Sequence, residues 1–309
     1  MALTFNDLDA AVNDRYLPDI INLAFLATPL WTRLHTKHNF IAGGGKDLRQ
    51  PVLYGKVPSG SFSGSGPFDT SYKQTHTMAQ WNWKHNYANV TIPGTDLDTA
   101  DSDLEIIGLL GPKMEAAGLT MKDNLATQVY GDGTGNGSQD MDGFMNGLDD
   151  GTTYASYGGI ARADISKWAG QLNSTGGAFS LDMLQTSYGT ATDGNEEVDL
   201  IMMPQAIYNK LWARTQTQQR FAREDLAKVG FTGIQFNRAD VVVDNYCPSG
   251  TIIGLNTKYI KFVINKNANM KWTEPKSGTN EYAYIRQLII SANLLVLAPW
   301  RCFMIQNVT

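Results

Sequence analysis

An aspartate- and glycine-rich segment near the middle of the chain contains residue types that can bind calcium. Asp132, Thr134, Asn136 and Gly137 match the first, third, fifth and sixth positions of a calcium-binding loop. The twelfth position, where a glutamate must hold the ion with both oxygens, is Gly143. The pattern therefore fails at its strongest ligand and favours a structural turn over a calcium site. A hydrolase that uses Asp132 is the enzymatic alternative.

Two other glycine-containing patterns do not match phosphate-binding loops. The glycines between positions 133 and 137 lack the GxGxxG spacing and follow no strand, which argues against a dinucleotide site. Lys46 follows a run of glycines, but Phe40 stands where a P-loop has its first glycine. Asp47 stands where a serine or threonine must bind magnesium. No cofactor is expected.

The other reactive side chains have structural explanations that are simpler than catalysis. His35 and His38 lie three residues apart on an expected helix, but no third ligand stands at a recognisable spacing, so no metal site is expected. Cys247 lies before a Pro-Ser-Gly turn, where a cysteine is usually buried. A group of carboxylates precedes a long helical pattern, where acidic residues complement the helix dipole. They are Asp96, Asp98, Asp101, Asp103 and Glu105. The sequence predicts no catalytic residue.

The composition describes a folded protein with few charges. Of its 309 residues, 42% are hydrophobic and 18% are charged, against about 25% charged in typical soluble domains. This fits a protein that hides much of its surface against copies of itself, although a soluble enzyme with an uncharged polar surface fits as well. The net charge of −5 argues against a dedicated nucleic-acid binder, which would have a basic stripe. It does not argue against a protein that encloses DNA, because an acidic wall avoids sticking to it.

Signals for secretion and membrane insertion are missing from the sequence. Cys247 and Cys302 are too few for a disulfide framework, which fits a reducing cytosol. Asp7 and Asp9 stand where a signal peptide would carry basic residues. The most apolar stretch, Leu288–Ala298, is interrupted by polar residues and is too short to span a bilayer. No membrane contact is expected.

Two segments in the first third of the chain contain apolar residues but cannot form a core of their own. Residues 1–42 read as short helices broken by prolines, one of which begins at Thr28-Pro29 and continues through Trp31. Residues 43–93 contain two strand patterns around a Ser-, Gly- and Pro-rich tip, Val57–Gln74. A hairpin of this length is too long to pack on its own domain, so it is expected to contact a partner.

Aromatic residues of these two segments are the candidate interface. The return pattern Met78–Ile92 places tryptophans and a tyrosine on one face of a strand at a period of two. Few basic residues accompany them, so a packing surface is favoured over stacking on bases or sugars. The expected interface also includes aromatic residues of the tip and of the preceding segment. The candidates are Trp81, Trp83, Tyr87, Phe62, Phe68, Tyr72 and Trp31.

The rest of the chain predicts an α+β protein. Apolar residues recur every three or four positions from Leu104 to Val129, which predicts a long helix that Pro112 should bend. A loop is expected over 131–153, followed by helices at 180–188 and 204–216 around a buried strand at 198–203. Further strands are expected at 240–244, 251–255, 259–265, 282–291 and 294–307.

Two segments resemble tailed-phage major capsid proteins of the Hong Kong 97 type. Residues 129–148 read VYGDGTGNGSQDMDGFMNGL, and residues 244–264 read DNYCPSGTIIGLNTKYIKFVI. The resemblance extends along nearly the whole chain and implies a division into five parts. These are an N-terminal arm (1–42), an extended loop (43–93), the spine helix of a peripheral domain (94–135), a mainly axial domain (136–240), and closing strands shared by both domains (241–309).

The resemblance also implies a function. Such proteins assemble into hexamers and pentamers of an icosahedral shell that encloses double-stranded DNA, in a virion that is assembled in the host cytoplasm. The implied partners are other copies of the chain, a portal, a scaffolding protein and, in some relatives, decoration proteins. Non-specific contact with the packaged double-stranded DNA is also implied. Relatives with a built-in scaffold begin with a charged helical leader that is missing here, and Met1 favours a separate scaffolding protein over a leader removed earlier. The alternative with the same fold is an encapsulin shell around a cargo enzyme.

Overall fold

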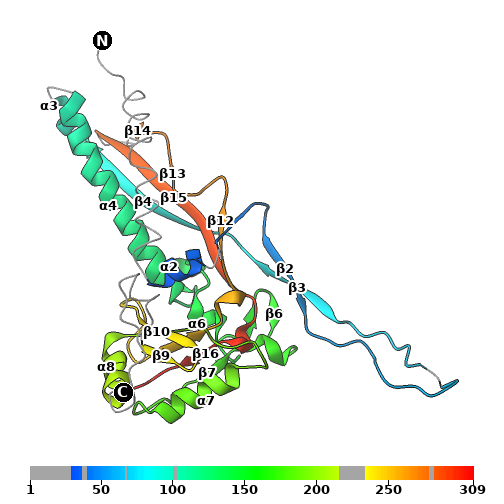
Figure 1. Ribbon diagram of the computed structural model, residues 1–309. Coiled ribbons are helices and arrows are strands. Elements are labelled where there is room, and N and C mark those ends of the chain that lie inside the picture. Colours follow the sequence, from blue (N-terminus) through cyan, green and yellow to red (C-terminus); the bar gives the residue numbers. More distant parts are fainter. Residues whose placement is uncertain (1–28, 37–39, 67, 100–102, 216–233, 278–281) are drawn as a thin grey trace.

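The computed structural model describes residues 29–36, 40–66, 68–99, 103–215, 234–277 and 282–309. Figure 1 shows two β-sheets, a long helix that runs along the first sheet, and a slender hairpin that projects away from both. The mixture of separate sheets and helices confirms the predicted α+β class.

The first sheet has six strands and is built around one long strand. Its members are β1 (Phe40–Gly43), β4 (Lys84–Pro93), β12 (Ile260–Asn265), β13 (Lys271–Trp272), β14 (Lys276–Ser277) and β15 (Ala283–Val296). Strand β15 pairs antiparallel with β4 on one side and with β12, β13 and β14 on the other. Strand β1 pairs parallel with β12. Because β15 has neighbours on both sides, it joins all the other strands into one sheet.

Helices cover one face of the first sheet. Helix α4 (Asp103–Val129) packs along β4 and β15, and the short helix α3 (Gly94–Thr99) precedes it. Helix α2 (Pro29–Thr36) packs against β12, where the ring of Trp31 meets that of Phe262 edge-on at 4.7 Å. The apolar spacing predicted for the long helix is confirmed by burial of its second half. The buried positions are Met114, Ala117, Met121, Leu125 and Val129.

Helix α4 is continuous through Pro112, and the bend predicted there stays a prediction. Within the part of the chain that the structure describes, no helix combines the length and the apolar character needed to cross a bilayer.

The second sheet also has six strands and packs with two helices. Its spatial order is β7 (Gln171–Asn173), β16 (Phe303–Ile305), β11 (Ile252–Leu255), β8 (Leu200–Met203), β10 (Ala239–Val243) and β9 (Ile234–Phe236). The flanking helices are α7 (Leu181–Ala191) and α8 (Gln205–Thr215). Ser180 caps α7 by accepting a hydrogen bond from the amide of Met183 at 3.2 Å. Every residue of β8 and β11 is buried, as expected for strands inside a core.

Short elements connect the two sheets. They are α5 (Gly135–Ser138), α6 (Phe144–Gly147), β5 (Ser156–Tyr157), β6 (Ile160–Ala161), and the 3-10 turns η1 (Ser166–Trp168), η2 (Thr257–Tyr259) and η3 (Pro299–Arg301). Apart from α5 and α6, the loop predicted over 131–153 contains no helix or strand, so the prediction is largely confirmed. The helices and strands predicted between 180 and 265 are confirmed within a few residues at each end.

The hairpin consists of β2 (Leu48–Leu53), β3 (His76–Trp81) and a tip over residues 54–75. The prediction of one return strand over Met78–Ile92 is wrong, because the strand breaks at Asn82 and Trp83. Strand β3 pairs with β2, whereas β4 pairs with β15, so the chain changes pairing partners between them.

A second correction concerns the C-terminal strands. Separate strands were expected at 282–291 and 294–307, but β15 runs unbroken through Ser291 and Asn293. Both polar side chains are buried and bonded: the Ser291 hydroxyl lies 2.6 Å from Nδ1 of His85, and Asn293 bonds Asp142 and Asn82. Residues 1–28 of the expected arm, together with His38, lie outside the described residues, as does the side chain of His35.

Candidate assembly surfaces

The hairpin carries most of the large apolar side chains that are exposed in the described part of the chain. Tyr72 at the tip is 92% exposed, and Phe62 and Phe68 are 63% and 68% exposed. The rings of Phe62 and Phe68 contact each other at 4.9 Å. The exposed apolar residues of the hairpin are Leu53, Tyr54, Val57, Phe62, Phe68, Tyr72 and Met78. Apolar groups gathered in this way are typical of an interaction surface.

The strand register divides the hairpin into two faces. Leu48 pairs with Trp81 and Gln50 with Ala79 on one face, and the apolar members of that face are buried. Pro51 pairs with Met78 and Leu53 with His76 on the opposite face. There Met78 is 54% exposed and Leu53 is 76% exposed. One face therefore packs on the subunit itself, and the other is exposed.

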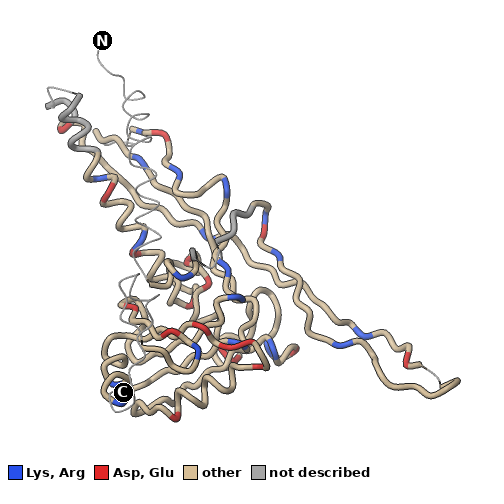
Figure 2. The backbone as a smooth tube through the Cα atoms, in the orientation of Figure 1, with Lys and Arg blue, Asp and Glu red and all other residues tan. Residues whose placement is uncertain are grey.

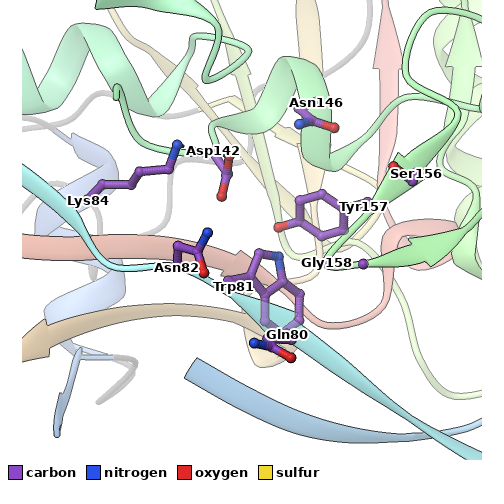
Figure 3. A pocket seen from close by; sticks show the side chains of 10 residues that line it. Gln80, Trp81, Asn82, Lys84, Asp142, Asn146, Ser156, Tyr157 and Gly158 are labelled. Atoms are coloured by element: carbon purple, nitrogen blue, oxygen red, sulfur yellow. Dashed lines mark ion pairs between the residues drawn. The ribbon is translucent and has the colours of Figure 1, made fainter. Parts of the chain in front are cut away.

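A small polar pocket of about 210 Å³ lies at the base of the hairpin (Figure 3). Lys84 lies over Asp142 with 3.8 Å between Nζ and Oδ1, and it donates to the carbonyl of Ser138 at 2.8 Å. The amide of Asn293 donates to the carbonyl of Asn82 and to Oδ2 of Asp142, both at 3.0 Å. These bonds hold the break between β3 and β4 in place, so the pocket belongs to the anchor of the hairpin.

The ring of Trp81 is part of that anchor and not of an exposed interface. Trp81 is 3% exposed, and its ring packs against Tyr157 at 5.6 Å and Trp168 at 6.3 Å. The backbone approaches the ring closely at Gly158, where an added Cβ would lie 2.8 Å from the indole carbons. The structure therefore corrects the expectation that Trp81 faces another subunit, because its contacts are within the chain.

The other expected aromatic residues do not share one face with Trp81. Trp31 is 1% exposed against Phe262, so its assignment to the interface is also corrected. Trp83 lies in the break, half-buried, and its Nε1 donates to the carbonyl of Gly45 at 2.9 Å. Tyr87 is 62% exposed on β4. The common face was inferred from an unbroken period of two, and the break at residues 82–83 interrupts that period.

The residues that the sequence reasoning missed are the aliphatic ones of the hairpin. Leu53, Val57 and Met78 are each more than half exposed. The available signal was their position within or next to the tip of Ser, Gly and Pro, which contains few apolar residues. For Phe62, Phe68 and Tyr72 exposure agrees with the expectation, and their role in subunit contact stays a prediction.

The Asp132 loop is organised by its own hydrogen bonds. The carboxylate accepts from the hydroxyl of Tyr154 at 2.7 Å and from the amide of Thr134 at 2.9 Å. These two bonds lower the pKa of Asp132, and burial together with the carboxylate raises the pKa of Tyr154 to about 12. Among the described residues, no three His, Cys, Asp or Glu side chains gather as a metal site would require. The geometry supports the predicted structural turn.

The two cysteines are buried, and burial raises the pKa of both thiols. For Cys302 the pKa rises to about 12. The thiol of Cys247 lies 3.5 Å from the carbonyl of Thr251. A neutral buried thiol is a poor nucleophile, so the prediction of a buried structural Cys247 is confirmed.

A buried arginine holds together the segment that connects the two sheets. Arg162 is 3% exposed, and its guanidinium donates to the carbonyls of Tyr154 at 3.0 Å and Trp168 at 3.2 Å. It also donates to the carbonyls of Asn146 and Asp149. Burial lowers the pKa of Arg162, and the carboxylate of Asp149 opposes that shift. The buried guanidinium group of Arg162 therefore fixes the backbone of the segment that packs on Trp81.

Comparison with known proteins gives agreement in structure without agreement in sequence. No family model and no curated protein matches the chain. The capsid asymmetric unit of cyanophage A-1(L) is similar over 88% of this chain and 90% of that chain, with 12% identity and a TM-score of 0.63. The capsid of a native GTA particle is similar over 89% and 90%, with 10% identity and a TM-score of 0.61.

An encapsulin shares the same architecture. The holo-SrpI encapsulin complex from Synechococcus elongatus PCC 7942 is similar over 87% of this chain and 85% of that chain, with 11% identity and a TM-score of 0.55. These three matches cover 87–89% of this chain. The chain therefore has the Hong Kong 97-like α+β capsid fold.

Proposed function

We propose that the chain is the major capsid protein of a tailed bacteriophage, a structural protein without a catalytic step. The observation that carries the proposal is the hairpin, which projects from the body and exposes apolar side chains on one face and at its tip. Exposing an apolar surface of this kind to water is energetically unfavourable in a free monomer, and assembly would bury it. The similarity in fold to phage capsids supports the proposal.

The proposed assembly is a shell of hexamers and pentamers. The hairpin extends to one side of the body, so it reaches a different surface on its neighbour, and contacts of this head-to-tail kind close into rings. We expect each subunit to bury more than the roughly 2,000 Å² that marks obligate interfaces. The interior would hold double-stranded DNA, and a portal, a scaffolding protein and decoration proteins are the further proposed partners.

The parts of the fold receive the following proposed roles. Residues 1–42 without β1 would form the arm. The extended loop predicted over 43–93 would end before β4, because β4 pairs with β15 in the first sheet. Helix α4 and the first sheet would form the peripheral domain, and the second sheet with α7 and α8 the axial domain. The continuity of β15 with β16 through η3 supports the idea that the closing strands serve both domains.

Assembly of the purified chain tests the proposal. We expect the chain, expressed alone or with a scaffolding protein, to sediment as closed particles that negative-stain microscopy shows as icosahedral shells. A stable, compact monomer under all these conditions would refute the proposal. The similarity to the SrpI complex supports an encapsulin shell as the alternative. The contents of particles isolated from the native host distinguish the two functions. Enclosed DNA supports the capsid, and an enclosed cargo protein supports the encapsulin.

Polar replacement of the tip aromatics should separate folding from assembly. We expect the variant Phe62→Ser, Phe68→Ser, Tyr72→Ser to have the same unfolding temperature as the parent, because these side chains are largely exposed. We expect the same variant to lose most of its particles in sedimentation. Leu119→Gln is the matched control, since Leu119 is 42% exposed on α4 away from the hairpin. Full assembly of the triple variant would exclude the tip from the interface.

A further inference from the structure

The exposed face of the hairpin has an apolar centre with polar side chains around it. Met78 and Pro51 are directly paired across the two strands, and Leu53 is a diagonal neighbour of Met78 on the same face. The other residues of this face are Arg49, His76 and Gln80, all of them exposed. Protein interfaces have this arrangement of an apolar centre and a polar rim, and methionine is enriched in them. Met78 therefore lies where a contact through this face would be centred.

Met78 is also the most exposed methionine of the described residues. The chain contains 11 methionines, and all except Met1 lie in the part that the structure describes. Met78 is 54% exposed on a hairpin that projects into solvent (Figure 1). Met145 and Met183 are half-buried and pack on the two cores. At most 1% of the residue surface is exposed at Met114, Met121, Met141, Met202, Met203, Met270 and Met304.

The other sulfur atoms of the chain are poorly placed to compete with Met78 for an oxidant. Cys247 and Cys302 are both buried. Oxidation of cysteine follows its thiolate character and its exposure, and a buried thiol that stays protonated at neutral pH has little of either. A reagent that attacks sulfur from the solvent therefore reaches Met78 before the other described sulfur atoms.

We propose that Met78 is a modification site, at which oxidation by hydrogen peroxide prevents association through the hairpin. The thioether sulfur gives two electrons to the peroxide, one oxygen atom forms a bond to sulfur, and the O–O bond breaks. The second oxygen leaves with both peroxide protons as water, and the product is methionine sulfoxide. The inference rests on the proposed function, because it takes the exposed face of the hairpin as a subunit contact.

The position of Met78 explains why oxidation would affect association and not folding. Sulfoxide formation converts a flexible apolar side chain into a polar one. In the unassembled chain the new oxygen atom stays in water, so the fold loses no contact. In a contact centred on Met78 the oxygen would be buried, and a buried polar atom without a hydrogen-bond donor is unfavourable. Residues near the centre of an interface are the most completely desolvated, so the effect is largest there.

Peptide mapping by mass spectrometry tests the site. The unassembled full-length chain is treated with dilute hydrogen peroxide, and the gain of one oxygen atom is followed at each methionine. We expect Met78 to react at least about 10-fold faster than each of the other described methionines, because susceptibility follows exposure. The inference is overturned if Met145, Met183 or a buried methionine reacts as fast as Met78.

Sedimentation of the same samples tests the consequence for assembly. We expect the oxidised parent to lose most of its particles while its circular dichroism stays unchanged. Treatment with methionine sulfoxide reductase and a thiol reductant should restore the particles. The matched control is Met78→Leu, which keeps an apolar side chain of similar volume without the sulfur and should assemble equally before and after peroxide. Met78→Gln introduces a polar side chain of similar length and should assemble poorly without any peroxide.

Two results in these assays would overturn the inference. One is normal assembly of a parent whose Met78 is oxidised. The other is an equal loss of particles by Met78→Leu after treatment, because a different residue would then carry the effect.

Preformed particles give an independent check. We expect Met78 to react about 10-fold more slowly in them than in the unassembled chain, because the contact excludes solvent. Equal rates would place Met78 outside the subunit contact and would also overturn the inference.

The untreated parent separates this inference from the proposed function. Failure of the untreated parent to form particles counts against the capsid assignment, and the peptide map still reports whether Met78 is the preferred site of oxidation. Particles that form from the untreated parent and are unaffected by oxidation of Met78 would refute only the inference.

Discussion

The variant Trp81→Ala is expected to lose about 3–5 kcal/mol of unfolding free energy, the range for removing a large aromatic side chain from a core. Trp81 is 3% exposed, and its ring lies among Tyr157, Trp168 and the backbone of Gly158. These groups cannot close the space, because the strand that carries the ring is tied by the amide of Gln80 to the carbonyl of Gly158 at 2.8 Å. Urea denaturation followed by circular dichroism measures the loss.

Trp212→Ala is the control for the size of the side chain. Trp212 is 38% exposed on α8, where it stacks on Tyr208 at 6.5 Å. Its removal should cost about 1 kcal/mol or less, since much of its surface is already in water. A Trp81→Ala subunit that is as stable as the parent but does not assemble would contradict the assignment of this ring to the subunit's own core.

Replacement of Arg162 by leucine should be the second severe change. The guanidinium donates to four carbonyl groups, of Asn146, Asp149, Tyr154 and Trp168. Leucine removes one donor from each of these carbonyls. Those of Asn146 and Asp149 keep bonds from the amides of Asp149 and Gly170. For the carbonyls of Tyr154 and Trp168, a buried acceptor that is left unpaired costs about 1–3 kcal/mol. We expect a total loss of at least 3 kcal/mol, roughly the cost of breaking a buried charge interaction. Lysine should rescue only part of it, because a single ammonium cannot reach all four carbonyls.

Arg238→Leu is the matched control for the loss of an arginine. Arg238 pairs with Glu197 at 2.8 Å, but its side chain is 79% exposed, and an exposed ion pair contributes about 1 kcal/mol or less. Thermal unfolding of the two variants should therefore differ by many degrees. Equal and small effects would show that the segment around Arg162 is held by its other contacts.

The elements with a strong period were predictable. Helix α4 follows from apolar residues spaced three or four apart, and the buried positions from Met114 to Val129 are those that the spacing selects. Strands β8, β11 and β12 follow from short runs rich in Ile, Val and Leu. Helix α7 follows from its cap at Ser180. The local sequence was sufficient to predict these elements, because each contains the apolar spacing, the apolar run or the cap that is typical of its type.

The boundaries that depend on tertiary partners were not predictable. Nothing in residues 78–92 marks the change from β2 to β15 as a pairing partner, so the break at Asn82 and Trp83 was missed. In the same way, Ser291 and Asn293 look like a strand boundary, but their bonds to His85 and Asp142 come from segments that are distant in sequence. Register is defined between two paired strands, and the sequence of one strand does not show which strand it pairs with.

The candidate assembly surfaces were also predictable only in part. Exposure of Phe62, Phe68 and Tyr72 followed from a tip too long and too polar to fold back on the body. The faces of Trp81 and Tyr87 depended on the missed break, so one common surface was expected where the structure has a buried anchor and an open sheet.

The two-stranded hairpin has a consequence for the chain before assembly. Among the described residues, β2 and β3 form a sheet only with each other, so each leaves most of one lateral edge open. On β3 the amide of Gln80 is an exception, because it bonds the carbonyl of Gly158. Such edges can recruit further strands and start fibrillar aggregates, and proline and charge are the usual protection. Pro51 removes one amide donor from β2, and Arg49 adds a charge on the same strand. The hairpin that we propose as a subunit contact thus also carries residues that discourage uncontrolled strand addition.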